Sequence, residues 1–84
     1  MEWYVYIAQA KTGYYYVGIS PDPEKRLGKH NSGKGSQMAL QQGPFKIVYV
    51  SPSYQNKSEA RKREIQLKGW TRKKKEKLIA GEWK

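Results

Sequence analysis

Residues 3–20 read WYVYIAQAKTGYYYVGIS, and this stretch decides the fold class. Apolar and aromatic side chains alternate over Trp3–Gln9 and again over Tyr14–Ser20, with a turn-like Ala10–Gly13 between them. Alternation with period two in β-branched and aromatic residues predicts two strands joined as an antiparallel hairpin. One face of this hairpin is expected to pack on the core, leaving a face of tyrosines on the other side. The aliphatic residues of the core-facing side are Val5, Ile7, Val17 and Ile19.

The chain beyond residue 20 predicts one more strand and three helices. Asp22 before Pro23 is typical of a helix start, so a first helix is expected to run to about Asn31. The glycine-rich stretch 31–44 predicts a long loop, with a turn of helix around Gln37–Gln41.

A third strand is expected over Phe45–Ser51, and helix signals follow it. Asn56 or Ser58 is expected to cap a second helix, since a glutamate lies three residues after Asn56 as in a capping box. Gly69 is expected to end that helix.

Thr71 is expected to cap a final basic helix that ends near Gly81. The resulting order, β-β-α-β-α-α, indicates an α+β fold in which helices flank a three-stranded antiparallel sheet. With 84 residues, the chain is expected to form a single domain over residues 1–84, because either half alone would be too small to bury a core.

The composition excludes several classes of site. The sequence contains no cysteine, which rules out a disulfide scaffold, a thiolate nucleophile and cysteine-based zinc modules. His30 is the only histidine, so a metal site with several histidines is impossible. No apolar run approaches the roughly 20 residues of a membrane span, and the first residues lack the pattern of a signal peptide. We therefore expect a soluble, cytoplasmic protein with no membrane partner.

Basic residues are concentrated in the last third of the chain. Seventeen Lys and Arg against seven Asp and Glu give a formal net charge of +10. Residues 57–84 hold eleven of those cations and four of the acids. Such a distribution is typical of a protein that binds a polyanion, and nucleic acid is the commonest such partner. A lysine-rich solubilising surface and an acidic membrane surface are the alternatives.

Two pairs of side chains are candidates for chemistry. Tyr6 and Tyr16 share one face of the predicted hairpin and are either a packing pair or a functional pair of phenols. Gly18 favours the second interpretation, because a glycine inside a strand often marks the close approach of a ligand or another backbone. Arg26 and His30 share one face of the first helix, where a guanidinium suits a phosphate. A solvated basic helix surface is the alternative there.

Glu64 is the unusual residue of the second helix. Helical spacing puts its carboxylate inside the apolar arc that contains Ala60 and Leu67. An unpaired charge on an inward face is costly, so the carboxylate needs a partner. That partner is a bound cation, a basic side chain or solvent at the edge of the core. A surface ion pair with Lys68 or Arg61 is the alternative without a catalytic role.

Taken in order, these residues resemble those of GIY-YIG nuclease domains. Tyr4–Val5–Tyr6 and Tyr16–Val17–Gly18 resemble the paired motif of that family, although tyrosine and valine replace its first glycine and its isoleucine. The resemblance covers nearly the whole chain, and it continues at Arg26, His30–Gly33, Glu64 and Lys68–Lys74. It is greatest with the small stand-alone bacterial members of the family.

The resemblance implies a divalent-metal-dependent endonuclease, a hydrolase that cuts DNA phosphodiester bonds by in-line attack of water. It implies that Glu64 holds a single Mg²⁺ or Mn²⁺ ion and that Tyr16 helps to activate the attacking water, supported by Tyr6. It also implies that Arg26 stabilises charge on the phosphate and that His30 aids proton transfer. The expected catalytic residues are therefore Tyr6, Tyr16, Arg26, His30 and Glu64.

DNA is the expected partner, and the cations expected to grip its backbone are Lys29, Lys34, Arg61, Lys68, Arg72, Lys73 and Lys74. With no second domain to confer target choice, cutting is expected to be weakly sequence-selective. Otherwise, cutting is expected to be directed by a partner or by DNA structure, such as a branch or a nick met in repair or recombination. The alternatives are a non-catalytic nucleic-acid-binding module on the same scaffold and a basic adaptor for an acidic protein partner.

Overall fold

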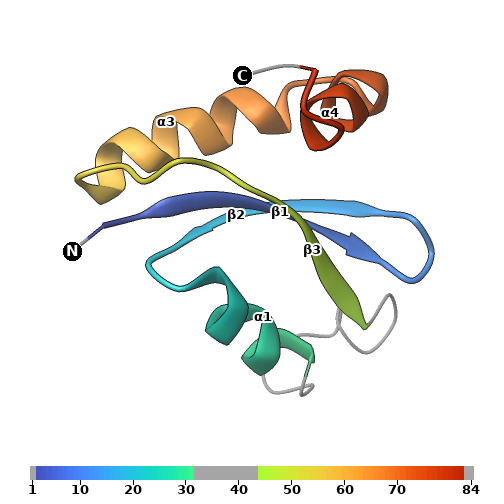
Figure 1. Ribbon diagram of the computed structural model, residues 1–84, viewed down its shortest axis with the longest axis horizontal. Coiled ribbons are helices and arrows are strands. Elements are labelled where there is room, and N and C mark those ends of the chain that lie inside the picture. Colours follow the sequence, from blue (N-terminus) through green and yellow to red (C-terminus); the bar gives the residue numbers. More distant parts are fainter. Residues whose placement is uncertain (1, 32–43, 83–84) are drawn as a thin grey trace.

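A computed structural model describes residues 2–31 and 44–82, with the backbone alone described at His30 and Asn31 (Figure 1). These residues form the predicted α+β fold in the predicted order β-β-α-β-α-α. The stretch 32–43, which includes the turn of helix expected at Gln37–Gln41, lies outside the described residues. The elements are β1 (Tyr4–Ala10), β2 (Tyr15–Ser20), α1 (Pro23–Asn31), β3 (Phe45–Val50), α3 (Lys57–Lys68) and α4 (Arg72–Ile79).

The three strands form an antiparallel sheet in the order β2-β1-β3. The first strand occupies the centre because it is apolar on both faces, and its residues 5–8 are at most 1% exposed. Its register with β2 sets Tyr6 opposite Gly18 and Ile7 opposite Val17. The register with β3 shifts between Ile7 and Ala8. Both outer positions of the sheet are therefore taken by β2 and β3, and β2 is the strand that borders the candidate site.

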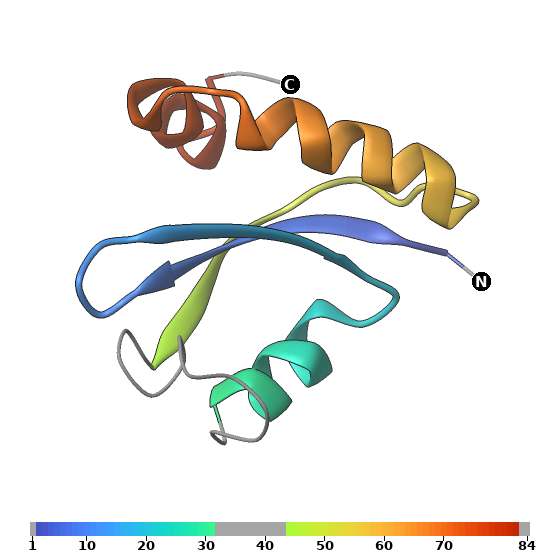
Figure 2. The ribbon, with the colours of Figure 1, turned by 180° about the vertical axis from the view of Figure 1, so that it is seen from behind.

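Helices cover both faces of the sheet, and each face has a core of its own (Figures 1 and 2). Under α3 and α4 the predicted aliphatic face packs as expected, around Val5, Ile7 and Val17. The opposite face, expected to carry tyrosines, is covered by α1 and forms a second core. Burial of Tyr6 to 1% exposure follows from this second layer, which the hairpin pattern alone did not predict. The second core consists of Tyr6, Ala8, Ala10, Leu27 and Phe45.

Side chains at the predicted caps begin the three helices of the described residues. The Asp22 carboxylate accepts a hydrogen bond from the Lys25 backbone N–H at 3.2 Å. The Asn56 side chain accepts from the Glu59 N–H at 2.9 Å, and the Thr71 hydroxyl accepts from the Lys74 N–H at 3.2 Å. Each cap satisfies a backbone donor that the first helical turn leaves without a partner. Among the described residues, no helix is long and apolar enough to cross a lipid bilayer.

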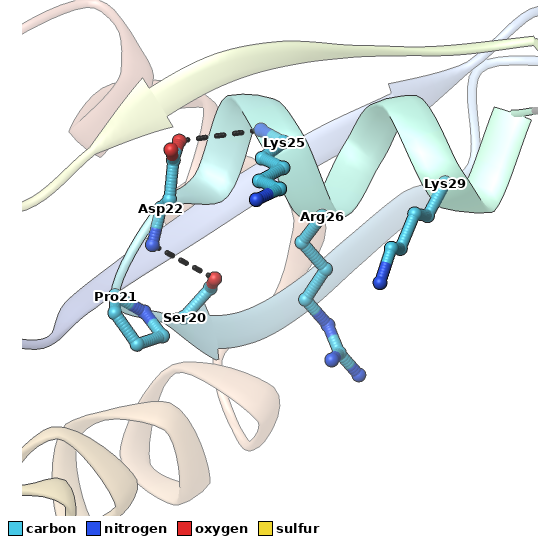
Figure 3. A pocket seen from close by; sticks show the side chains of 6 residues that line it. All are labelled: Ser20, Pro21, Asp22, Lys25, Arg26 and Lys29. Atoms are coloured by element: carbon cyan, nitrogen blue, oxygen red, sulfur yellow. Dashed lines mark hydrogen bonds between the residues drawn. The ribbon is translucent and has the colours of Figure 1, made fainter.

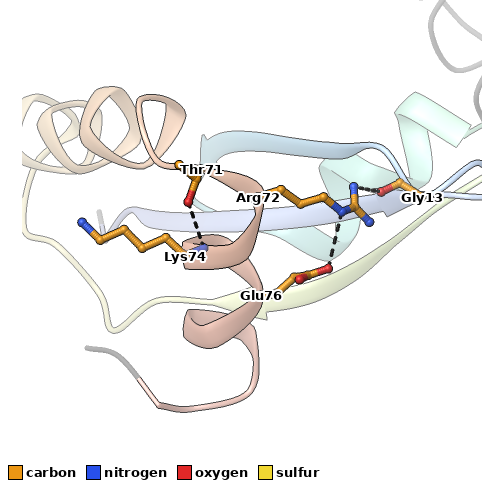
Figure 4. Close-up of polar contacts among 5 residues, drawn as sticks. All are labelled: Gly13, Thr71, Arg72, Lys74 and Glu76. Atoms are coloured by element: carbon orange, nitrogen blue, oxygen red, sulfur yellow. Dashed lines mark hydrogen bonds and ion pairs between the residues drawn. The ribbon is translucent and has the colours of Figure 1, made fainter.

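Arg72 fastens α4 to the turn between β1 and β2 (Figure 4). Its guanidinium donates a hydrogen bond to the Gly13 carbonyl oxygen at 2.8 Å and lies 4.4 Å from the centre of the Tyr15 ring. It also pairs with Glu76, one helical turn further on, at 3.4 Å. The role of Arg72 in DNA binding stays a prediction, and in the structure this side chain holds the last helix against the hairpin.

An Arg72→Ala substitution is therefore expected to lower the free energy of unfolding by about 1–2 kcal/mol, because it removes both a charge-assisted hydrogen bond and a cation–π interaction. Arg72→Lys should restore little of this stability, since an ammonium lacks the planar fork that meets a carbonyl and a ring together. Lys73→Ala removes an equal charge from the exposed neighbouring position and should change stability by less than about 0.5 kcal/mol. Urea unfolding of the three variants measures these differences, and equal stabilities of Arg72→Ala and Lys73→Ala would contradict the interpretation.

Candidate active site

Gly18 on β2 makes room for the phenol of Tyr6, which extends across β2 from the neighbouring strand β1. A Cβ atom at position 18 would lie 2.7 Å from the Tyr6 hydroxyl oxygen and 2.8 Å from Cζ. The group that approaches this glycine is therefore a side chain of the same hairpin, rather than a ligand or another backbone. The Tyr6 ring lies 6.3 Å from the Tyr16 ring, centre to centre, with the two planes tilted by 52°. Both phenols are thus gathered at one place beside β2.

Burial raises the pKa of the Tyr6 phenol above its ordinary value of 10, and the nearby Tyr16 acts in the same direction. A hydrogen bond from Arg26 and the charge of that guanidinium oppose the shift without cancelling it. Tyr6 therefore stays neutral at physiological pH and serves as a polar support for Arg26. In return, hydrogen bonding to Tyr6 raises the pKa of Arg26, and the charge and hydrogen bonding of Tyr16 add to the effect.

A hollow of about 230 Å³ opens along the outer edge of β2, and we call it the central pocket. Its wall brings together Tyr16 and Gly18 from β2, Arg26 from α1 and Glu64 from α3. These elements meet there because α1 and α3 cover opposite faces of the sheet and β2 is an outer strand between them (Figure 1). The remaining charged and aromatic side chains of the wall are Trp3, Lys57 and Arg61.

Glu64 faces inward from α3, as its place between Ala60 and Leu67 predicted. It is 9% exposed, whereas Ile65, the next residue, is 63% exposed. One carboxylate oxygen lies 3.4 Å from the Lys68 ammonium, whose side chain is 55% exposed. The two interpretations of the sequence therefore coexist, because the carboxylate both borders the central pocket and pairs with a lysine on its own helix.

The donor chemistry of the central pocket fits one hard divalent cation. Mg²⁺ prefers oxygen ligands and commonly keeps several waters when it is bound through one or two carboxylates and substrate phosphates. Glu64 supplies one carboxylate, and the pocket has volume for waters and a phosphate beside it. Within residues 2–31 and 44–82, no three His, Cys, Asp or Glu side chains are grouped so as to hold a metal. Among the described residues, Glu64 is the carboxylate of the central pocket that would hold such a cation.

The other predicted residues are distributed as follows. Arg61 borders the central pocket, and Lys29 lines a hollow next to it. The Lys74 ammonium lies 4.8 Å from the centre of the Trp70 ring, and Lys73 is exposed on α4. The backbone of His30 is in the last turn of α1, while its side chain and the whole of Lys34 lie outside the described residues.

Lys57 and Trp3 border the central pocket but were not among the predicted residues. Their side chains also meet, since the Lys57 ammonium lies 5.4 Å from the centre of the Trp3 ring. Lys57 precedes Arg61 by four residues and Glu64 by seven, so helical periodicity contained a signal for it. Trp3 offered no such signal, because its place in the alternating pattern indicated a core residue.

The GIY-YIG catalytic domain, as a family model, matches residues 2–77 of this chain. The chain belongs to the GIY-YIG family. Such a domain implies a nuclease family and a nucleic-acid ligand. The match confirms the resemblance drawn from the two tyrosine motifs, and it spans every element from β1 to α4 except the last turn of that helix.

Relatives of this GIY-YIG domain are small bacterial proteins of similar length. A UPF0213 protein of Staphylococcus saprophyticus is 43% identical over 77 residues, which cover 92% of this chain and 93% of the relative. The solution NMR structure of a UPF0213 protein from Bacillus halodurans has a TM-score of 0.59 at 39% identity and covers 95% of this chain and 84% of its own. A solution NMR structure of a protein from E. faecalis has a TM-score of 0.64 at 32% identity, with coverage of 96% and 85%.

A Gly18→Ala substitution in this GIY-YIG domain should lower the free energy of unfolding by about 1–3 kcal/mol, because the new methyl group would overlap the buried Tyr6 phenol. Gly28→Ala is the matched control, since a Cβ there meets nothing within 4 Å and α1 should gain about 0.5–1 kcal/mol. Urea unfolding measures both effects. A Gly18→Ala protein as stable as the wild type would show that the phenol does not need the space.

A Tyr6→Phe substitution should reveal the raised pKa of this phenol through the pH dependence of stability. The unfolded chain loses the Tyr6 proton near pH 10 and the folded chain only above it, so the Tyr6 contribution is complete below about pH 10 and declines as the pH rises past that value. The loss of unfolding free energy caused by Tyr6→Phe should therefore be constant up to about pH 10 and smaller at about pH 11. Tyr14→Phe removes an exposed phenol and is the control, for which a narrowing of equal size would contradict the assignment.

Proposed function

We propose that this GIY-YIG domain is a divalent-metal-dependent endonuclease that hydrolyses DNA phosphodiester bonds. The observation that carries the proposal is the convergence of Tyr16, Arg26 and Glu64 on one pocket from three different elements. A carboxylate for a hard cation, a guanidinium for a phosphate and a phenol for a proton are the groups that metal-assisted phosphodiester hydrolysis requires.

Arg26 is proposed to bind the scissile phosphate. Its planar fork suits two phosphate oxygens, and its positive charge opposes the negative charge that develops as water attacks phosphorus. Tyr6 is proposed as a positioning residue that acts through Arg26, because its hydroxyl is buried against the guanidinium and stays neutral. This support lets the guanidinium keep one orientation before the substrate arrives.

Glu64 is proposed to hold a single Mg²⁺ or Mn²⁺ ion. When bound, such an ion supplies Lewis-acid polarisation of a phosphoryl oxygen and lowers the pKa of a coordinated water. Lys68 must give up the Glu64 carboxylate at least in part, and its half-exposed side chain allows it to turn toward solvent or a phosphate.

Tyr16 is proposed to orient the attacking water and to pass on its proton. Phenols have an ordinary pKa near 10, so a tyrosine serves better as a relay than as a lasting base at neutral pH. His30, four residues after Arg26 on α1, is proposed as the group that receives this proton. Water then bonds to phosphorus as the bond to the leaving sugar oxygen breaks, and that oxygen takes a proton from solvent.

The cations around the central pocket suit the phosphate backbone of a nucleic acid rather than the recognition of a base sequence. Phosphate contacts hold nucleic acid without reading sequence, and Lys57 and Arg61 lie beside the proposed scissile position. We therefore propose weak sequence selectivity, with the target chosen by a protein partner or by DNA structure, such as a branch or a nick, in repair or recombination. We propose a cytoplasmic location for the protein on the same grounds.

One observation favours a second candidate, a nucleic-acid-binding module without turnover. The Glu64 carboxylate is paired with Lys68, and a module that never loads a cation would keep that pair permanently. Such a module would bind DNA equally well with and without a chelator. It would also bind equally well with and without Glu64.

A Glu64→Ala substitution is expected to reduce Mg²⁺- or Mn²⁺-dependent nicking of DNA by at least about 100-fold, because the only proposed protein ligand of the cation is removed. DNA binding should persist, since the change removes a negative charge. Glu59→Ala, on an exposed position of the same helix, removes an equal charge and should leave nicking unchanged. Gel assays of nicking and binding measure both properties. A wild-type protein that binds but nicks no DNA, branched and nicked forms included, with either metal would establish the second candidate instead.

A further inference from the structure

A second hollow adjoins the central pocket on the side of α1 (Figure 3). It has a volume of about 250 Å³, and we call it the α1 hollow. Three of its residues, Ser20, Pro21 and Arg26, also line the central pocket. The two hollows therefore adjoin at the end of β2, and Arg26 lines both.

The α1 hollow is strongly positive. Lys25, Arg26 and Lys29 line it, against the single carboxylate of Asp22. That carboxylate already accepts the Lys25 backbone N–H at 3.2 Å as the helix cap. Lys25 and Lys29 are four residues apart and so lie on one face of α1. Figure 3 shows the Arg26 and Lys29 side chains extending to the same side of the helix.

We propose that the α1 hollow binds the phosphodiester group next to the scissile one, so that the DNA strand passes from the central pocket over Pro21 onto α1. The inference rests on the proposed function only in taking the central pocket as the place of the scissile phosphate. Lys25 and Lys29 hold the neighbouring phosphate, and Arg26 lies between the two.

A hollow at the other end of the central pocket is less suited to a phosphate. It shares Tyr16 with the central pocket and is lined by Tyr14, Tyr15, Lys68 and Lys75. Lys68 is engaged by Glu64 there, and Arg72 lies over the Tyr15 ring. One of its two lining cations is thus paired with a carboxylate, whereas the α1 hollow is lined by Lys25 and Lys29 in addition to Arg26. The charge balance therefore directs the neighbouring phosphate to α1.

The double variant Lys25→Ala/Lys29→Ala tests this site, in the Glu64→Ala background so that binding is measured without cleavage. Fluorescence anisotropy with a labelled DNA oligonucleotide, repeated over a range of salt, gives the affinity and its salt dependence. We expect the affinity to fall on the order of tenfold, because two charge-assisted interactions are removed. The slope of log affinity against log salt should also fall by about 0.7 to 0.9 for each phosphate that the variant no longer neutralises.

Lys62→Ala/Lys77→Ala is the matched control, since it removes two exposed lysines that line none of the hollows described above. If both double variants show the same decrease in affinity and slope, net charge alone is responsible and the α1 hollow is not a site. An unchanged slope in the Lys25/Lys29 variant overturns the inference as well.

A neutral methylphosphonate linkage, moved one position at a time along the oligonucleotide, locates the bound phosphate. At one position it should weaken binding of the Glu64→Ala protein and have no effect on the protein that also lacks both lysines. In the wild type, that position should be adjacent to the nicked bond. Absence of nicking would refute the proposed function but leave the binding result readable. Nicking with no position that depends on the lysines would refute the α1 hollow alone.

Discussion

The contact between the Tyr6 phenol and the backbone at Gly18 is the constraint on which the candidate site depends. The Tyr6 side chain extends across β2, where the residue opposite it, Gly18, has no side chain to obstruct the hydroxyl. The hydroxyl then lies at the inner wall of the second core, where a guanidinium from α1 meets it. The Tyr6 hydroxyl must find a hydrogen-bond partner because it is shielded from water. Its contacts thereby fix the β1–β2 hairpin, α1 and the Arg26 guanidinium relative to one another.

Much of this architecture could be predicted from the sequence, because the local patterns and the helix caps agree with the final fold. The alternating hairpin, the Asp22 cap and the Thr71 cap all appear as predicted. The inward position of Glu64 followed from helical spacing alone. The second core did not follow from such local patterns. The apolar side chains that cover it, Leu27 and Phe45, lie on elements far apart in the chain. A periodic pattern describes one element at a time and does not say which distant element will cover it.

The sequence and the structure differ most in which basic residues they point to as the nucleic-acid surface. Summed over the chain, the basic residues point to the last third as the nucleic-acid surface. In the fold, several of these cations are engaged within the molecule. Arg72 holds the hairpin turn, Lys68 pairs with Glu64, and Arg63 and Lys74 lie 5.1 Å and 4.8 Å from the Trp70 ring centre. The cations that line the central pocket are Arg26 from α1 and only two from the last third, Lys57 and Arg61, in the first turns of α3. Counting charges cannot separate the two uses, because cation–π and carbonyl interactions depend on tertiary structure.

The position of β2 at the border of the sheet has a consequence for how copies of this molecule meet. An outer strand presents backbone donors and acceptors that invite pairing with the same strand of another molecule, and natural proteins guard such strands with charge. Arg26, Lys57 and Arg61 stand beside β2 on both of its faces. Two such strands brought together would set like charges against each other, so the side chains that suit a phosphate also discourage self-association. Neutralising them carries a risk of aggregation, and a bound polyanion, by covering the strand, takes over their protective role.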